Sequence, residues 1–312
     1  MSKLTSPAKI AVVGSINMDL VLRCSQFPKP GETVVALSFD EVPGGKGANQ
    51  AVAAARAGAS VAMLGRVGDD AFANRLIRGL SNYEIDCENI LVTPDCESGL
   101  AMITVDQAGQ NSIIAVEGAN GRLSPEDVRK HRQVIESSQT VLLQLEIPTK
   151  TVLEVIQIAR AANVRVILDP APAPHRCPQK ILQVDLICPN EHEAEELTGI
   201  SLDSPEQILA AGQALYQQGA RHVVITLGSR GSFLFDDQGG RLIPALVTDS
   251  VDTTAAGDAF AGALAVSWAE QGNLEQAVRF GNAAGAIAAS KKGAQPSIGS
   301  RQGIECLLES IK

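Results

Sequence analysis

The segment 251–260, Val-Asp-Thr-Thr-Ala-Ala-Gly-Asp-Ala-Phe, combines small residues with an aspartate where a loop is expected to pass into a helix. The first turn of such a helix leaves the backbone N–H groups of Ala256, Gly257 and Asp258 free, and with the helix dipole these groups attract an anion. A carboxylate beside that anion repels a resting phosphate, but it is well placed to deprotonate a hydroxyl that attacks one. The pattern therefore predicts phosphoryl transfer with Asp258 as the base. The alternative is that Asp258 only caps the helix.

Composition limits the possible partners. The chain has 312 residues, 45% hydrophobic and 20% charged, which is typical of a soluble globular protein of one large or two ordinary domains. A net charge of -9 and only 3% aromatic residues argue against binding to nucleic acid or to a membrane surface. The sequence has no stretch of 18 apolar residues and no C-x-x-C pair among its six cysteines. We therefore expect no membrane span, reduced thiols, a cytoplasmic location and no zinc site.

Apolar, β-branched runs alternate with amphipathic stretches along most of the chain. The runs predict buried strands at residues 10–13, 61–64, 141–145, 164–168, 186–188 and 223–227. Helices are expected between them at 48–57, 151–161 and 205–217, and after them at 257–271, 274–290 and 301–311. Strands that alternate with helices pair in parallel through crossover connections. The sequence therefore predicts an α/β fold with a mainly parallel central sheet and helices on both faces.

Two regions interrupt this alternation, at residues 20–41 and 99–116. In the second, the runs Met102-Ile-Thr-Val105 and Ser112-Ile-Ile114 flank a turn at residues 107–110, which predicts a hairpin. Neither region has enough apolar residues for a core of its own. We therefore expect a single domain over residues 1–312, in which residues 17–43 and 98–117 form a small projecting sheet, a lid over a site at the strand ends.

The loop Gly44-Gly-Lys-Gly-Ala-Asn-Gln50 precedes an alanine-rich helix. Its glycines let the backbone approach a small ligand, and Asn49 offers both a donor and an acceptor, which suits a polyol. The loop matches neither a Walker A loop nor a G-x-G-x-x-G loop, because Lys46 is followed by glycine and Gln50 stands at the third glycine position. The alternative is a tight turn into a helix.

Asn17 and Asp19 follow the first predicted strand, at the edge where open α/β sheets bind ligands. They are two positions apart on an extended segment, so their side chains point to the same side and can hydrogen-bond neighbouring hydroxyls. The alternative for Asp19 is a plain turn residue.

Two further polar loops follow predicted strands. Asn190 and Glu193 lie three apart in Pro189-Asn-Glu-His-Glu-Ala-Glu-Glu196 and share one helix face, so they can order waters around Mg²⁺. An acidic run is also typical of a solvated surface. The loop Thr226-Leu-Gly-Ser-Arg-Gly231 offers backbone and hydroxyl donors to the phosphates or ribose of a nucleotide, and its plain interpretation is a hairpin into residues 232–235.

In their order along the chain, these motifs resemble the signatures of the ribokinase-like (pfkB) carbohydrate kinases. The match includes Asn17-Met-Asp19, the loop 44–49, Asn190-Glu-His-Glu193, the loop 226–231 and Asp252-Thr-Thr-Ala-Ala-Gly-Asp258, and it extends to Lys292-Gly-Ala-Gln-Pro-Ser297. The resemblance covers almost the whole chain. It implies a ribokinase-like three-layer fold with a small β-sheet lid. It also implies ATP-dependent phosphorylation of the 5-hydroxyl of D-ribose by direct in-line transfer.

The resemblance further implies roles for individual residues. Asp258 would be the base, and the backbone N–H groups of Ala255, Ala256 and Gly257 would stabilise the transferred phosphoryl group. The residues expected to hold the sugar are Asn17, Asp19, Gly45, Lys46, Asn49, Glu146 and Asp258. Those expected to hold Mg²⁺-ATP are Asn190, Glu193, Thr226, Gly228, Ser229, Gly231, Gly257 and Asn282, with Asn190 and Glu193 reaching Mg²⁺ through water. A K⁺ activator would be ringed, mostly by carbonyls, by Asp252, Thr254, Ala288, Lys291, Gly293 and Ser297.

Three points stay open from the sequence. Many members of the wider family carry glycine where this chain has Ala255, whose methyl group leaves the N–H donor intact if the residue does not need a positive φ. The substrate could be another sugar, such as deoxyribose or a fructose-type sugar, or a nucleoside, although a lid with only Phe27 and Phe39 as aromatics does not favour a nucleoside. The chain could also be a catalytically silent nucleotide- or pentose-binding regulator. In the family the lid strands often form a homodimer contact, which we expect here.

Overall fold

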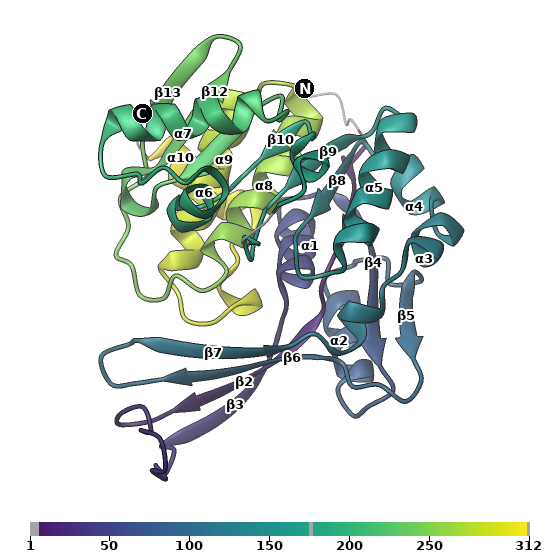
Figure 1. Cartoon of the computed structure of the whole chain (residues 1–312), viewed down its shortest axis with the longest axis vertical. Coiled ribbons are helices and arrows are strands. Elements are labelled where there is room, and N and C mark those ends of the chain that lie inside the picture. Colours follow the sequence, from purple (N-terminus) through teal and green to yellow (C-terminus); the bar gives the residue numbers. More distant parts are fainter. Residues whose placement is uncertain (1–5, 175–176, 311–312) are drawn as a thin grey trace.

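The central layer of the molecule is a nine-stranded sheet, described here from a computed structural model that covers residues 6–174 and 177–310. Its strands are β1 (Lys9–Val13), β4 (Ser60–Gly68), β5 (Ile90–Thr93), β8 (Thr140–Leu143), β9 (Arg165–Leu168), β10 (Leu186–Ile187), β11 (Val223–Thr226), β12 (Ser232–Asp236) and β13 (Gly239–Ile243). They lie side by side in the order β13-β12-β11-β10-β9-β8-β1-β4-β5 (Figure 1). Every neighbouring pair from β11 to β5 is parallel. At the other end of the sheet, β12 pairs antiparallel with both β11 and β13.

Both faces of this sheet are buried, which explains the continuous apolar runs. In β1 the side chains of Ile10 and Val12 pack into one hydrophobic cluster, whereas those of Ala11 and Val13 pack into the other. Successive side chains of a strand point to opposite faces, so a strand covered on both sides is apolar at every position. The predicted mainly parallel sheet is confirmed.

Helices cover the two faces as separate layers (Figure 1). One face carries α1 (Lys46–Arg56), α2 (Ala73–Ser81), α8 (Ala256–Gln271), α9 (Leu274–Ala289) and α10 (Arg301–Glu309). The other carries α3 (Pro125–Lys130), α4 (Gln133–Glu136), α5 (Thr149–Ala161), α6 (Glu191–Thr198) and α7 (Pro205–Gln217). The three-layer α/β fold expected from the sequence is therefore present.

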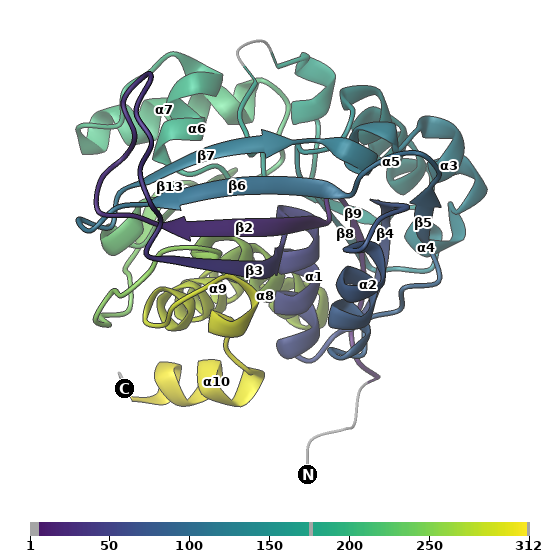
Figure 2. The same ribbon diagram turned by 90° about the horizontal axis from the view of Figure 1, so that it is seen from below.

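A second sheet projects from the body and is seen across its face in Figure 2. It consists of β2 (Asn17–Arg23), β3 (Ser38–Gly44), β6 (Gly99–Val105) and β7 (Asn111–Val116), in the order β3-β2-β6-β7, and we call it the projecting sheet. The predicted hairpin joins β6 to β7. Its turn forms because Asp106 Oδ1 accepts from the backbone N–H groups of Ala108 and Gln110, while Gly109 takes a φ of 79°.

The predicted elements differ from the observed ones mainly at their ends. The strand expected at 141–145 ends at Leu143, because the backbone N–H of Leu145 donates its hydrogen bond to the carbonyl of Ala171. The sequence analysis did not predict α2 or β5. The helix expected at 301–311 ends at Glu309, and Ile311 lies outside the described residues. Within the described ranges, no helix has the length and apolar composition that crossing a membrane requires.

Candidate active site

The N-terminus of α8 is open toward the space between the body and the projecting sheet. The residue before the helix, Ala255, has φ 58° and ψ 10°, and no side chain caps the first turn. The prediction of free N–H groups is wrong for Ala256, whose N–H donates to the carbonyl of Thr253 at 3.1 Å. Those of Ala255, Gly257 and Asp258 have no acceptor among the described residues. Together they leave a small anion site at the positive end of a 16-residue helix.

Ala255 adopts a positive φ of 58°. The sequence analysis expected its methyl group to be tolerated only if no positive φ was needed, and that condition is not met. Left-handed backbone costs a non-glycine residue about 1–2 kcal/mol. The chain therefore carries local strain beside the anion site, at a position that favours glycine.

Asp258 lies in the first turn of α8 with 6% of its surface exposed. Its side chain caps no backbone N–H group in the described structure. Instead, Oδ2 accepts from Nδ2 of Asn49 at 3.0 Å and Oδ1 accepts from Nε2 of Gln50 at 3.2 Å. Both donors come from α1, which packs closely on α8 because Gly262 has no side chain. A Cβ at Gly262 would lie 2.5 Å from that of Ala53.

The projecting sheet brings Asn17 and Asp19 to the same place. Both are buried on β2, and Oδ1 of Asn17 accepts from Nδ2 of Asn120 at 2.7 Å. Burial, followed by the negative charges of Glu146 and Asp258, raises the pKa of Asp19 to about 7. Gly44 pairs with Asn17 across β2 and β3, and a Cβ at Gly44 would lie 2.1 Å from Oδ2 of Asp19. The glycine is therefore needed to leave room for the carboxylate.

The glycine loop turns at Gly45, where φ is 89°, and α1 begins at Lys46. The backbone N–H of Lys46 donates to Oε2 of Glu146 at 3.2 Å, and the hydroxyl of Ser15 donates to the same oxygen. Burial lowers the pKa of Lys46, but the charges of the nearby carboxylates outweigh burial and hold that pKa above its usual value. These carboxylates are Asp169, Asp258, Glu146 and Glu193. Lys46 therefore stands among four acidic side chains.

On the other side of the anion site, Asn190 and Glu193 form a reciprocal cap of α6. The N–H of Asn190 donates to Oε2 of Glu193 at 2.8 Å, and the N–H of Glu193 donates to Oδ1 of Asn190 at 2.9 Å. Burial raises the pKa of Glu193, more than this backbone bond and the charge of Lys46 lower it. One oxygen of Glu193 thus remains for a further partner. Among the described residues, no three His, Cys, Asp or Glu side chains form a direct metal cage.

The loop after β11 supplies backbone to the same region. Gly228 and Gly231 have φ values of 55° and 96°, and the N–H of Leu227 closes the turn on the carbonyl of Gly231. Thr226 forms a bridge with Asn190, so this loop lies beside the start of α6. Asn282 on α9 is buried. Its Oδ1 accepts from the hydroxyl of Ser232, and its Nδ2 donates to the carbonyls of Ile243 and Pro244. Its role here is to hold β12 and β13 against α9.

Three of the residues expected to surround a cation, Asp252, Thr254 and Gly293, are joined by hydrogen bonds. Oδ1 of Asp252 accepts from the N–H and the hydroxyl of Thr254, and Oδ2 accepts from the N–H of Gly293 at 2.9 Å. Burial acts to raise the pKa of Asp252, but these hydrogen bonds together hold it below the usual value. The N–H of Lys291 donates to the carbonyl of Ala288, and the buried hydroxyl of Ser297 donates to the carbonyl of Ala294.

A cleft of about 500 Å³ lies between the projecting sheet and this loop region. Its lining includes Asp19, Arg23 and Asp40 from the sheet, and Asp252, Thr254 and Gly293 from the body. Segments from both ends of the chain thus face each other across it, beside the start of α8.

Comparison with known proteins identifies this arrangement. The model of the pfkB family carbohydrate kinases matches residues 7–301. The chain belongs to this family. It is 40% identical over 293 residues to a ribokinase of Haemophilus influenzae, a match that covers 94% of this chain and 96% of that protein. It is 38% identical over 289 residues to a deoxyribokinase of Salmonella typhi, with 92% and 94% covered.

Two further matches bear on length and fold. A bifunctional ribokinase/ribose-5-phosphate isomerase A of Fructilactobacillus sanfranciscensis is 40% identical over 95% of this chain, which spans 55% of that protein's length. The solved structure of Arabidopsis thaliana ribokinase complexed with ribose and ATP has a TM-score of 0.89 at 33% identity, over 98% of this chain and 99% of that one. The family and the fold expected from the motifs are confirmed.

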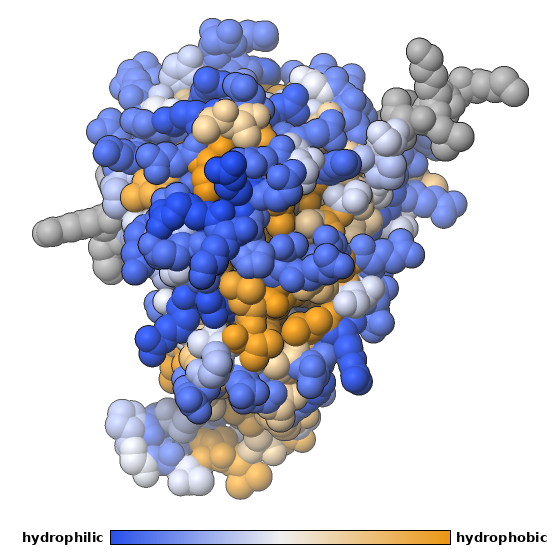
Figure 3. Space-filling model, turned by 90° about the vertical axis from the view of Figure 1, so that its right-hand side faces the viewer, coloured by the Kyte–Doolittle hydropathy of each residue, from blue (hydrophilic) through white to orange (hydrophobic). Residues whose placement is uncertain are grey.

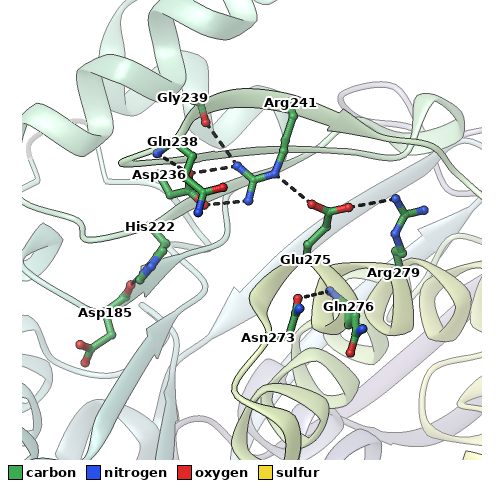
Figure 4. Close-up of polar contacts among 10 residues, drawn as sticks. All are labelled: Asp185, His222, Asp236, Gln238, Gly239, Arg241, Asn273, Glu275, Gln276 and Arg279. Carbon is green, nitrogen blue, oxygen red and sulfur yellow. Dashed lines mark hydrogen bonds and ion pairs between the residues drawn. The ribbon is translucent and has the colours of Figure 1, made fainter.

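A larger cavity of about 600 Å³ lies elsewhere, between the β12–β13 hairpin and the start of α9 (Figure 4). Four of its charged side chains are paired with one another. Arg241 binds both oxygens of Asp236 and reaches Glu275, and Glu275 also binds Arg279. These contacts join a hairpin to a helix, so the cavity is explained by a structural ion-pair network and not by a second pfkB-type active site.

Sequence reasoning missed several polar residues of the site. Gln50 contacts Asp258, Asp169 contacts Gln50, and Gln144 contacts Gln50 from the other side. Ser15 likewise donates a hydrogen bond to Glu146, and Asn120 donates one to Asn17. A signal was available for Gln50, which ends the glycine-loop motif, and for Asp169, which directly follows a buried strand.

Proposed function

We propose that the chain transfers the γ-phosphoryl group of ATP to the 5-hydroxyl of D-ribose, giving D-ribose 5-phosphate and ADP. The observation that carries this proposal is the position of Asp258, a buried carboxylate held by two amide donors in the first turn of α8. There it can remove the proton of the attacking hydroxyl. The free N–H groups of Ala255 and Gly257 stabilise the charge on the phosphoryl group, because their dipoles are fixed before the reaction begins.

The sugar would lie between β2 and α1, against Asn17, Asp19, Gly45, Lys46, Asn49 and Glu146. Asn49 supports this placement because its Nδ2 is bound to Asp258, while its buried Oδ1 has no partner among the described residues. A buried acceptor without a donor is unfavourable, and a sugar hydroxyl would satisfy it. Burying Asp19 beside other carboxylates is also unfavourable without hydroxyl donors. The projecting sheet would act as the lid of a single domain.

Mg²⁺-ATP would lie across the start of α6, α8 and the loop 226–231, against Asn190, Glu193, Thr226, Gly228, Ser229 and Gly231, with Asn282 shaping the pocket wall. The free oxygen of Glu193 suits a hydrated Mg²⁺, which prefers to keep most of its waters. Bound Mg²⁺ supplies neutralisation of phosphate charge. Lys46 and the α8 N-terminus supply the fixed positive charge of the chain itself.

The region around Asp252 fits a K⁺ activator. The carbonyl oxygens of Asp252, Thr254, Lys291 and Gly293 accept no hydrogen bond within the described ranges, and the Asp252 carboxylate adds a negative charge. Oxygen atoms without donors are the ligands that a hard cation needs. Ala288 and Ser297 would support this loop region. An ion here would reinforce the geometry of the loop that leads into α8.

The outer face of the projecting sheet supports a homodimer. Leu22 pairs with Phe39 and Met102 pairs with Ile114, so these side chains share the face turned away from the cleft. Phe39, Met102 and Ile114 are 53%, 44% and 67% exposed. Figure 3, a view from the side, also shows apolar surface in the middle and the lower part of the molecule. A contiguous exposed apolar face marks an interaction site, and we assign it to a second copy of the chain.

The six free cysteines support a reducing, cytoplasmic location.

An assay of ADP release over a panel of sugars, with and without K⁺, tests the proposal. We expect turnover with D-ribose and stimulation by K⁺. The deoxyribokinase among the relatives makes 2-deoxyribose the second candidate, and a higher kcat/KM with it would reassign the substrate. No turnover with any pentose, hexose or nucleoside would leave a silent binding protein. Asp258→Asn should keep sugar and ATP binding but lose about 10²–10⁴ in rate.

A further inference from the structure

Gln50 is fully buried and joins the proposed base to a second carboxyl group. Its side-chain Nε2 donates to Oδ1 of Asp258 at 3.2 Å and to Oδ2 of Asp169 at 2.8 Å. An amide nitrogen carries two hydrogens, so both donors are used. Its Oε1 accepts from Nε2 of Gln144 at 2.6 Å. Every polar atom of the Gln50 side chain therefore has a partner.

The orientation of this amide is set by its neighbours. If Gln50 were flipped, its oxygen would face two carboxyl groups and its nitrogen would face the donor of Gln144. Gln144 is itself enclosed, because a Cβ at Gly14 would lie 1.9 Å from its Oε1. That oxygen has no partner among the described residues. A rigid series of contacts thus runs from Gln144 through Gln50 to Asp258.

We propose that Gln50 is a positioning residue for Asp258, oriented by Gln144 and Asp169, and that it keeps the carboxylate turned toward the sugar hydroxyl. The inference rests on the proposed role of Asp258 as the base. Asn49 holds one oxygen of that carboxylate and Gln50 holds the other, so rotation of the group breaks both bonds. A base held within a few tenths of an ångström of its productive position transfers protons more effectively.

The electrostatic surroundings make this donor important. Three acidic side chains and one lysine interact electrostatically with Asp258 from the neighbouring elements, namely Asp19, Asp169, Glu193 and Lys46. Burial raises the pKa of Asp169 to about 8, although Lys46 acts against it. Gln50 supplies a hydrogen-bond donor to both Asp169 and Asp258, where the neighbouring acidic groups would otherwise repel each other.

Gln50→Met tests the proposal because methionine has a similar length but no donor. We expect the single-turnover rate with ribose to fall about 10- to 100-fold while the KM for ribose changes less than about threefold. A rate loss that only follows thermal unfolding, or a loss that appears in the KM for ribose and not in the single-turnover rate, would overturn the proposal.

Gln144→Met supplies a second measurement, because Gln144 reaches Asp258 only through Gln50. Alone it should lower the rate by about three- to tenfold, and it should add almost nothing in the Gln50→Met background. Additive losses would contradict the series of contacts. Thr140→Val is the matched control and should leave the rate unchanged, because it removes a buried hydroxyl of β8 that has no partner among the described residues.

Asp258→Asn distinguishes a failure of the proposed role of Asp258 from a failure of the proposed role of Gln50. If this variant keeps most of the rate, the proposed function of Asp258 fails whatever Gln50 does. If it is inactive while Gln50→Met retains the wild-type rate, the base stands and the positioning role of Gln50 is refuted.

Discussion

The N–H of Gly293 donates to Oδ2 of Asp252 at 2.9 Å, and this bond joins the loop before α8 to the loop after α9. Asp252 also holds Thr254 through its other oxygen. The backbone that enters the anion site is therefore fixed from two sides by one carboxylate.

Asp252→Asn should weaken both the loop and the response to K⁺. We expect the K⁺ concentration for half-maximal activation to rise about tenfold, because a negative charge beside the proposed ion is lost. Titration of activity with K⁺ measures this effect, and an unchanged K⁺ response would place the ion elsewhere. Asp203→Asn, on an exposed loop, is the control.

The same variant gives a pH-dependent stability difference. The pKa of Asp252 is lowered in the folded state, so its contribution is complete above the unfolded-state value near ~3.9 and is lost as pH falls through the lower folded-state value. The difference in free energy of unfolding between the wild type and Asp252→Asn should therefore be present at neutral pH and shrink in acid. Urea unfolding at several pH values tests this sign.

Asp19 predicts a pH dependence in sugar binding. Its pKa of about 7 means that the carboxylate becomes protonated as pH falls through neutrality. The ionised form accepts hydroxyl hydrogens more strongly, so the KM for ribose should rise about three- to tenfold between pH 8 and pH 6. Asp19→Asn should have a higher KM that no longer changes over this range. A wild-type KM that stays constant would show that another group controls binding.

Ala255→Gly should relieve backbone strain. Removing the methyl group at a φ of 58° gains about 1–2 kcal/mol in the folded state, and the greater freedom of glycine when unfolded offsets about 0.4–1 kcal/mol of this. We expect a net gain of about 0.5 kcal/mol in free energy of unfolding, with kcat within about twofold of the wild type. Ala269→Gly, inside α8, is the matched control and should lose about 1 kcal/mol. Destabilisation by both variants would mean that Ala255 is not strained.

The outer face of the projecting sheet predicts the oligomeric state. Ile114→Lys would bury an unpaired charge in the proposed homodimer, so light scattering should detect monomers at micromolar concentration. The neighbouring Ile113 lies on the same strand but on the opposite face, where it pairs with Ile103 beside the cleft. Ile113→Lys should remain dimeric. A wild type that is monomeric would refute the assignment of this surface.

The sequence predicted those parts of the site that follow from local chemistry. Strand-end loops with glycine and asparagine indicated where ligands could bind, and the helix starting near Asp258 was expected one residue from its observed start. Contacts between distant segments could not be found in this way. Gln144 reaches Gln50 across 94 positions of sequence, and neither residue belongs to a periodic pattern that would mark it as polar and buried.

The same limit applies to the backbone. The left-handed conformation of Ala255 and the pairing of the Ala256 N–H with Thr253 depend on how the loop 251–255 is tied to Gly293. Residue type alone predicted a free N–H group for Ala256 and left the φ of Ala255 open. The missed strand β5 has only four residues at the sheet edge, and such a short element carries a weak signal.

The close contact between Gly262 and Ala53 fixes the rotation of α8 about its own axis relative to α1. Each residue added to a helix turns the following positions by about 100°. One residue inserted between Asp258 and Gly262 would therefore leave the helix pair packed but point the carboxylate away from Asn49 and Gln50. The direction in which the proposed base faces is thus set one turn away, by a residue that has no side chain.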